Sequence, residues 1–272
     1  MILWTLTRSF DFHGREVRYD VRGDGPPLVM VHGTPWSSLN LRHLIDALSS
    51  DFTVHFHDLL GYGQSSMTPG DVSLGVQNQV LAALLDHWGL DDPVIVGHDF
   101  GGATVLRTHL LDGRDFRAMV LIDPVAVAPW GSPFFRHVGE HEAAFAGTPR
   151  YIHEAVVRAY VQTAAHQPLP EETLEAIVRP WTGDEGQAAF YRQIAQADQR
   201  YTDEVQELYP GIRCPVLVLW GEEDTWIPLA KGEELASLIP GARLQTVPDA
   251  GHLVIEEEPG VLVEAIRRFA GG

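Results

Sequence analysis

The residues best suited to chemistry form a short stretch in which one carboxylate stands in a glycine-rich turn. An apolar run at 94–96 leads into the sequence GHDFGG at 97–102. Small residues around a central nucleophile permit the strained strand-to-helix turn of a G-x-S-x-G elbow, and here aspartate takes the place of serine. A carboxylate that attacks saturated carbon gives a stable ester, whereas attack on an ester gives an anhydride-like intermediate. The residue type therefore indicates alkyl transfer, with Asp99 as the nucleophile.

A second turn can stabilise negative charge beside that nucleophile. The apolar run at 28–31 ends in the sequence HGTPW at 32–36. Such a turn can aim the backbone N–H of Thr34 inward, where it would join the N–H of Phe100. Two backbone donors directed at one oxygen form an oxyanion hole.

An acid and a histidine follow two later apolar runs. Asp224 comes soon after the run at 216–220, and His252 comes soon after the run at 244–247. We expect His252 to activate water and Asp224 to orient the imidazole. Asp123 also follows an apolar run and remains an alternative acid.

Together these motifs resemble those of the α/β-hydrolase fold family, whose chain order is nucleophile, acid, histidine. The resemblance extends from about residue 15 to the end of the sequence, with a gap in the middle. It implies a mostly parallel central sheet flanked by helices, with a helical cap inserted after the sixth strand. Among members with an aspartate nucleophile, the chain resembles epoxide hydrolases and the haloalkane and haloacetate dehalogenases.

The leaving group separates these activities. An epoxide oxygen needs a proton donor, and epoxide hydrolases use two tyrosines of the lid for this purpose. The sequence Phe-Tyr-Arg at 190–192 resembles the segment that carries one of them, which makes Tyr191 a candidate. Tyr151 is the candidate for the other, with Tyr160 as its substitute and Tyr201 as a weaker candidate for the second role. A tyrosine with an ordinary pKa near 10 is protonated at neutral pH.

A halide instead needs N–H donors. Haloalkane dehalogenases carry a tryptophan directly after the nucleophile, whereas Phe100 cannot donate a hydrogen bond. Haloacetate dehalogenases carry an arginine near the nucleophile, and only the unplaced Arg107 and Arg136 could serve here. An indole N–H aimed at the leaving group would favour a dehalogenase, and the candidates are Trp130, Trp36 and Trp181. The residues expected to line the substrate pocket are Trp36, Trp130, Phe134 and Trp226.

The expected function is thus hydrolysis through an alkyl ester, with a small or medium apolar epoxide as the substrate and water as the second reactant. A haloalkane or haloacid dehalogenase is the alternative. An esterase-like or non-catalytic member of the same fold is a third hypothesis.

Apolar runs and helical spacing indicate where these residues are placed. A hairpin comes first, and alternating strands and helices follow up to residue 122. Expected strands are 4–10, 17–22, 28–31, 53–57, 94–96, 119–122, 216–220 and 244–247; expected helices are 39–48, 74–88, 100–111, 151–164, 171–178 and 186–197. The alternation stops between 123 and 216, which predicts a core domain of residues 1–126 and 211–272 and a cap of residues 127–210.

The amino-acid composition limits the kinds of partner that the protein is expected to bind. The 272 residues include 19 Lys and Arg against 37 Asp and Glu, a net charge of −18, which argues against nucleic acid or an anionic membrane. The start of the chain lacks a basic segment followed by an apolar stretch, and we expect a cytoplasmic monomer or homodimer. The single cysteine, Cys214, cannot form an internal disulfide.

No cofactor or metal is expected from the histidine spacing. His55 and His57 would share one side of a strand, and His137 and His141 would lie one helical turn apart. We expect neither pair to have the acidic third ligand and the strand context of a zinc site.

Overall fold

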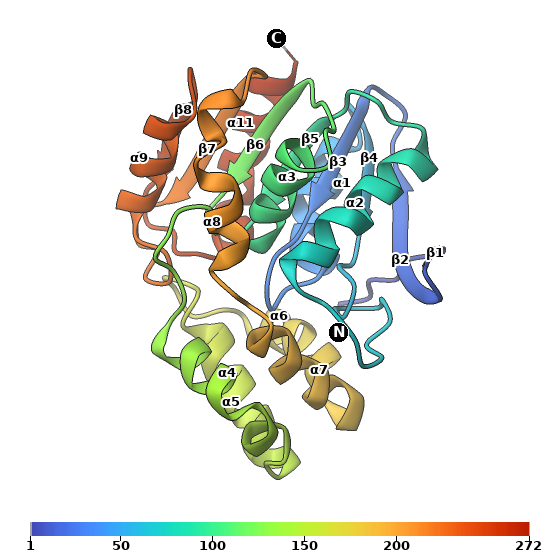
Figure 1. Ribbon diagram of the computed structural model, residues 1–272, viewed down its shortest axis with the longest axis vertical. Helices are drawn as coiled ribbons and strands as arrows, with labels where there is room; N and C mark the ends of the chain where they lie inside the picture. Colours follow the sequence, from blue (N-terminus) through green and yellow to red (C-terminus); the bar gives the residue numbers. More distant parts are fainter. Residues whose placement is uncertain (1, 272) are drawn as a thin grey trace.

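A single eight-stranded sheet organises the protein, and the computed structural model describes residues 2–271 (Figure 1). Its strand order is β1-β2-β4-β3-β5-β6-β7-β8. β1 pairs antiparallel with β2, and β2 pairs antiparallel with β4; every other pair is parallel. Helices α2 and α3 cover one face, and α1 and α11 cover the other. This is the α/β architecture predicted from the sequence.

The strands are β1 (Arg8–Phe12), β2 (Arg15–Arg22), β3 (Pro27–Val31), β4 (Thr53–His57), β5 (Val94–His98), β6 (Ala118–Ile122), β7 (Val216–Gly221) and β8 (Arg243–Val247). The core helices are η1 (Ser38–Leu41), α1 (Arg42–Leu48), α2 (Leu74–Trp88), α3 (Phe100–Leu110), α9 (Leu229–Leu238), α10 (Val254–Glu257) and α11 (Pro259–Ala270). After β6 the chain forms α4 (Pro133–Ala146), α5 (Arg150–Gln162), α6 (Glu171–Val178), η2 (Arg179–Trp181), α7 (Gly183–Ala195), α8 (Arg200–Gln206) and η3 (Tyr209–Gly211).

The middle strands are apolar because both of their faces are covered. Every residue of β5 and β6 is buried, which suits the Val-, Ile- and Leu-rich runs that predicted them. The carboxyl ends of these parallel strands meet at one edge of the sheet. The cap helices α4 to α7 lie beyond this edge, at the opposite end of the molecule from the C-terminus (Figure 1).

Two parts of the predicted element order need correction. The first strand is β1 rather than residues 4–10, because His13 and Gly14 both have positive φ (53° and 82°) and form a tight two-residue hairpin turn. Apolar spacing also did not predict helices α4 and α8 of the cap or helices α9, α10 and α11 of the core. Ser132 caps the start of α4 by accepting a hydrogen bond from the N–H of Phe135, and Pro133 occupies the first turn, a local signal of a helix start.

Within residues 2–271, no helix combines the length and the apolar character needed to span a membrane.

A buried ion pair fixes the segment that follows the last strand. Arg42 at the start of α1 donates to both carboxylate oxygens of Glu256 in α10, at 2.6 and 2.8 Å. Their side chains are 11% and 3% exposed. Since α10 starts two residues after His252, this pair holds the histidine loop against the core.

Removing one partner of this pair should be costly. We expect Arg42→Ala to lower the free energy of unfolding by about 3 kcal/mol, because it leaves the Glu256 carboxylate buried without its charge partner. That corresponds to a fall in Tm of roughly 6–10 °C, measurable by scanning calorimetry. Arg268→Ala is the matched control, because its pair with Glu264 is exposed at 73% on both sides. An equal Tm for the two variants would contradict the assignment.

Candidate active site

Asp99 stands at the tip of the turn between β5 and α3. Its backbone adopts φ 54° and ψ −121°, a conformation that costs a non-glycine residue of the order of 1–3 kcal/mol. The turn is possible because its neighbours lack side chains. A Cβ on Gly101 would lie 2.1 Å from the Val31 carbonyl oxygen, and one on Gly97 would lie 2.6 Å from that of Gly101. The predicted elbow is therefore present.

A histidine and a second carboxylate meet Asp99. His252 Nε2 lies 3.1 Å from Asp99 Oδ2, and His252 Nδ1 lies 2.8 Å from Asp224 Oδ2. The other Asp224 oxygen accepts hydrogen bonds from the N–H groups of Trp226 and Ile227, each at 2.8 Å. All three triad side chains are buried, so their geometry is held by direct contacts.

Asp123, the alternative acid, has a different environment. Its Oδ1 accepts the Gly221 N–H at 3.0 Å, and its buried Oδ2 has no hydrogen-bond partner among the described residues. Burial and the nearby Asp224 carboxylate raise the pKa of Asp123 well above its ordinary value. Asp224, which bonds directly to the imidazole, is thus the acid that the geometry supports.

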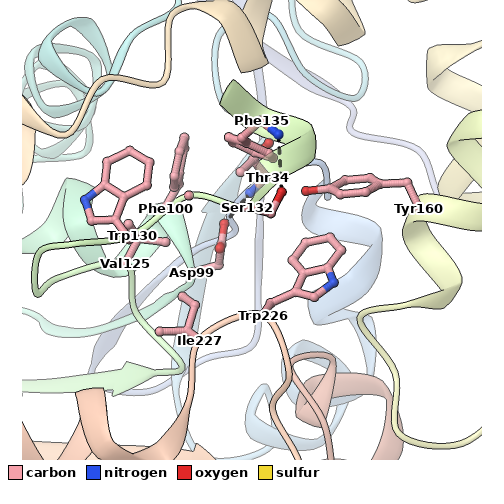
Figure 2. Close-up of a pocket in the computed structure, with 11 residues that line it drawn as sticks. Thr34, Asp99, Phe100, Val125, Trp130, Ser132, Phe135, Tyr160, Trp226 and Ile227 are labelled. Carbon is pink, nitrogen blue, oxygen red and sulfur yellow. Dashed lines mark hydrogen bonds between the residues drawn. The ribbon is translucent and has the colours of Figure 1, made fainter. Parts of the chain in front are cut away.

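The turn predicted to form the oxyanion hole contacts Asp99 directly. The N–H of Thr34 donates to Asp99 Oδ1 at 2.6 Å (Figure 2). Phe100 is the first residue of α3, where an N–H has no acceptor within the helix. A carbonyl oxygen of an Asp99 ester would occupy the place of this Oδ1, beside the Thr34 donor.

Two residues that sequence reasoning missed stabilise this turn. The Thr34 hydroxyl donates to Gln193 Oε1 at 2.6 Å, and the Tyr62 hydroxyl donates to the same oxygen at 3.1 Å. Gln193 belongs to cap helix α7 and lies 159 residues from Thr34 along the chain. No local motif could have identified such a contact.

The pocket above Asp99 is narrow and largely aromatic (Figure 2). Its cavity volume is about 40 Å³. It is lined by Thr34, Asp99, Phe100, Val125, Trp130, Gly131, Ser132, Phe135, Tyr160, Trp226 and Ile227. No arginine or lysine is among these described residues, so the pocket offers no cation to a substrate carboxylate.

The expected pocket residues are only partly brought together. Trp130 and Trp226 line the pocket. Phe134 does not, because it packs inside the cap against Phe145 and Tyr160, and the neighbouring Phe135 lines the pocket instead. Trp36 is also not part of the lining: it is buried and stacks on Trp226, with ring centroids 5.6 Å apart.

The assignment of the tyrosines needs correction. Tyr151 is 73% exposed on α5, so it cannot reach a ligand in the pocket. Tyr191 is buried, but its hydroxyl bonds to His153 Nδ1 at 3.0 Å, within the cap. Tyr160 lines the pocket, and its hydroxyl points into it (Figure 2). The nine positions between Tyr151 and Tyr160 correspond to about two and a half helical turns, which puts them on opposite faces of α5.

None of the three indole N–H groups considered as halide donors is available to a ligand in the pocket. Trp130 donates its N–H to Thr202 Oγ1 at 2.7 Å, and Trp181 donates to the Pro35 carbonyl at 2.8 Å. The Trp36 N–H has no partner among the described residues, but Trp36 does not line the pocket. Arg107 is likewise bound elsewhere, to Asn78 and Glu204.

The charges of the site are set by burial and by the carboxylates. Burial alone would lower the pKa of His252, but Asp224 and Asp99 outweigh it and hold this pKa well above its usual value. The imidazole is therefore protonated while Asp99 is a free carboxylate. Burial, with the Asp99 charge, raises the pKa of Tyr160 well above 10, so its phenol stays neutral.

Comparison with known proteins agrees with this fold. The sequence pattern of the Alpha/beta hydrolase family matches residues 28–265. An alpha/beta hydrolase fold protein from Burkholderia ambifaria is similar, with 49% identity, a TM-score of 0.95, and coverage of 97% of this chain and 98% of that one. An uncharacterized hydrolase from Bacillus subtilis is 28% identical over 96% of this chain and 97% of its own length. A soluble epoxide hydrolase from Corynebacterium sp. is 24% identical, covering 94% of each chain.

Because the pKa of His252 is raised in the folded protein, the free energy of unfolding should depend on pH. A group whose pKa is higher when folded stabilises the fold fully below its unfolded pKa, near 6.5, and this contribution is lost as pH rises through the folded pKa. We therefore expect the difference in unfolding free energy between the wild type and His252→Gln to shrink as pH rises from 6.5. Urea unfolding between pH 6 and 9.5 measures it. A difference independent of pH would rule out a protonated His252 in the resting protein.

Proposed function

As the chain belongs to the alpha/beta hydrolase family, we propose that it hydrolyses small apolar epoxides through a covalent ester on Asp99. The observation that carries this proposal is the neutral Tyr160 hydroxyl, which points into the pocket that holds the nucleophile. A phenol is a suitable acid for an oxygen leaving group that departs as an alkoxide. The pocket residues offer no equivalent N–H cluster for a halide.

In the first step an Asp99 oxygen attacks one epoxide carbon and the ring C–O bond breaks. Tyr160 gives its proton to the departing oxygen, which leaves a β-hydroxyalkyl ester and a tyrosinate. The tyrosinate is unstable because burial disfavours its charge. The imidazolium of His252 then gives a proton to the tyrosinate, which restores the phenol and leaves His252 neutral.

Esterification itself prepares the second step. It removes the Asp99 charge, one of the two that raise the pKa of His252, so this pKa falls and the imidazole can remain neutral, the form that accepts a proton. Neutral His252, oriented by Asp224, takes a proton from water, and the hydroxide attacks the ester carbonyl. The resulting oxyanion accepts a hydrogen bond from the Thr34 N–H. When it collapses, the alkoxide leaves and takes the proton of the added hydroxyl, which gives the diol. Asp99 is again a carboxylate and His252 is again protonated.

The shape and charge of the pocket define the substrate class. A cavity of about 40 Å³ admits only a small group beside Asp99 unless the cap moves. Aromatic walls favour apolar substituents. Because no arginine or lysine lines the pocket, a carboxylate-bearing substrate such as a haloacid would be buried without a charge partner.

Trapping the ester tests the mechanism. We expect His252→Gln to react once with a small epoxide and stop, because water is no longer activated. Intact mass should then increase by the mass of the epoxide, and peptide mapping should place the addition on Asp99. An adduct formed from a haloalkane, with loss of the halide, would instead favour a dehalogenase.

The double variant His252→Gln/Asp99→Ala is the control for this trap and should carry no adduct. A single turnover of the wild type in ¹⁸O-water gives a second readout. Because water attacks the ester carbonyl, the label should enter Asp99 before it enters the diol. A diol that is labelled in the first turnover would exclude the ester.

Tyr160→Phe tests the proton donor. Removing the acid should slow ester formation with epoxides by about 10²- to 10⁴-fold, with little loss of stability because the ring is kept. Single-turnover kinetics in the His252→Gln background measure this step alone. Tyr151→Phe is the matched control on the same helix and should leave the rate unchanged. Unimpaired ring opening by Tyr160→Phe would overturn the assignment.

A further inference from the structure

The outer face of the cap carries a cluster of potential metal ligands that has no part in the chemistry above. His137, Glu140 and His141 are exposed on α4, and one ligand atom of each lies within 4.8 Å of the other two. The two imidazole rings have centroids 4.8 Å apart. The prediction that this histidine pair lacks an acidic third ligand is wrong, because Glu140 supplies one.

We infer that His137, Glu140 and His141 bind one divalent transition-metal ion, with Zn²⁺ as the best fit. Histidines four residues apart on one helical face are an established arrangement for zinc. Two imidazoles and one carboxylate select Zn²⁺, Ni²⁺ or Cu²⁺ over Mg²⁺ and Ca²⁺, which prefer oxygen ligands. Three protein ligands leave a position for water, as in open zinc sites.

The geometry is close to what such an ion needs. Metal–ligand distances of about 2.0–2.2 Å put neighbouring ligand atoms of a tetrahedral site roughly 3.4 Å apart. The ligand atoms, within 4.8 Å of one another, therefore have to approach by at most about 1.4 Å. Because all three side chains are exposed, rotation about their own bonds can supply this movement.

Local packing leaves the cluster accessible. Val138 on the same helix is fully buried, so α4 packs inward through that face and presents the three ligands outward. Among the described residues, no ion pair engages Glu140 or either histidine, and the aromatic rings that contact His137 are those of His141 and Phe145. The net charge of −18 also favours binding of a cation.

The three ligands lie at a kink in α4, the helix whose start lines the pocket. His141 has non-helical φ −135° and ψ 32°, which marks a kink in α4. An ion bound to His137 before the kink and His141 at it would fix the angle between the two halves. Because Ser132 and Phe135 at the start of α4 line the pocket, the ion would stabilise the cap on which the pocket depends.

Equilibrium dialysis of the protein without a histidine tag, followed by metal analysis, tests this inference. We expect one Zn²⁺ per chain. His137→Ala and His141→Ala should each weaken binding by at least about tenfold, the loss seen even for indirect partners of a metal. Glu140→Gln should weaken it less, since an amide oxygen remains. Mg²⁺ should not compete.

His166→Ala is the matched control, because His166 is another exposed histidine and lies outside the cluster. Alanine is a strong helix former, so the two α4 variants should fold, which a thermal scan checks. Zn²⁺ should raise the Tm of the wild type and of His166→Ala but not of the His137→Ala/His141→Ala double variant. Equal zinc binding by the double variant and the wild type would overturn the inference.

Discussion

The structure depends on how it accommodates one buried carboxylate. Asp99 is only 3% exposed, and a charge so far from water is tolerated only with direct partners. One oxygen is paired with the N–H of Thr34 and the other with the imidazole of His252. These partners follow β3 and β8, while Asp99 itself follows β5. The parallel sheet is what allows three distant segments to converge, because it brings the carboxyl ends of its strands to one edge.

The cap takes part in the same arrangement through polar contacts that cross from one layer to the other. Gln193 of α7 binds the hydroxyl of Thr34, and Trp226 donates its indole N–H to Thr163 after α5. Trp226 also donates its backbone N–H to Asp224 and stacks on the imidazole of His252, with centroids 5.1 Å apart. A movement of the cap therefore bears on both the oxyanion turn and the acid loop.

A feature could be predicted from the sequence where it is determined by residues that are neighbours along the chain. The elbow at Asp99 and the turn at Thr34 are defined by neighbouring small residues, so their motifs sufficed. The cap tyrosines could not be assigned in this way, because which face of α5 or α7 packs inward depends on the helices around it. Tyr151 and Tyr160 lie on opposite faces of α5, so Tyr151 is exposed while Tyr160 lines the pocket. The Gln193 contact is non-local and left no sequence signal at all.

The charge of Asp99 also explains how one imidazole can serve both halves of the proposed reaction. While the carboxylate is free, it keeps His252 protonated, and a protonated imidazole cannot deprotonate water. Premature water activation beside an unreacted nucleophile is thereby suppressed. In the proposed reaction His252 gives its proton to the tyrosinate, and the loss of the Asp99 charge on ester formation then keeps the imidazole neutral. On this fold a serine nucleophile would be neutral before attack, so it would place no such condition on the histidine. In the proposed reaction the aspartate therefore does more than favour alkyl transfer, because its charge would also set the order of the two steps.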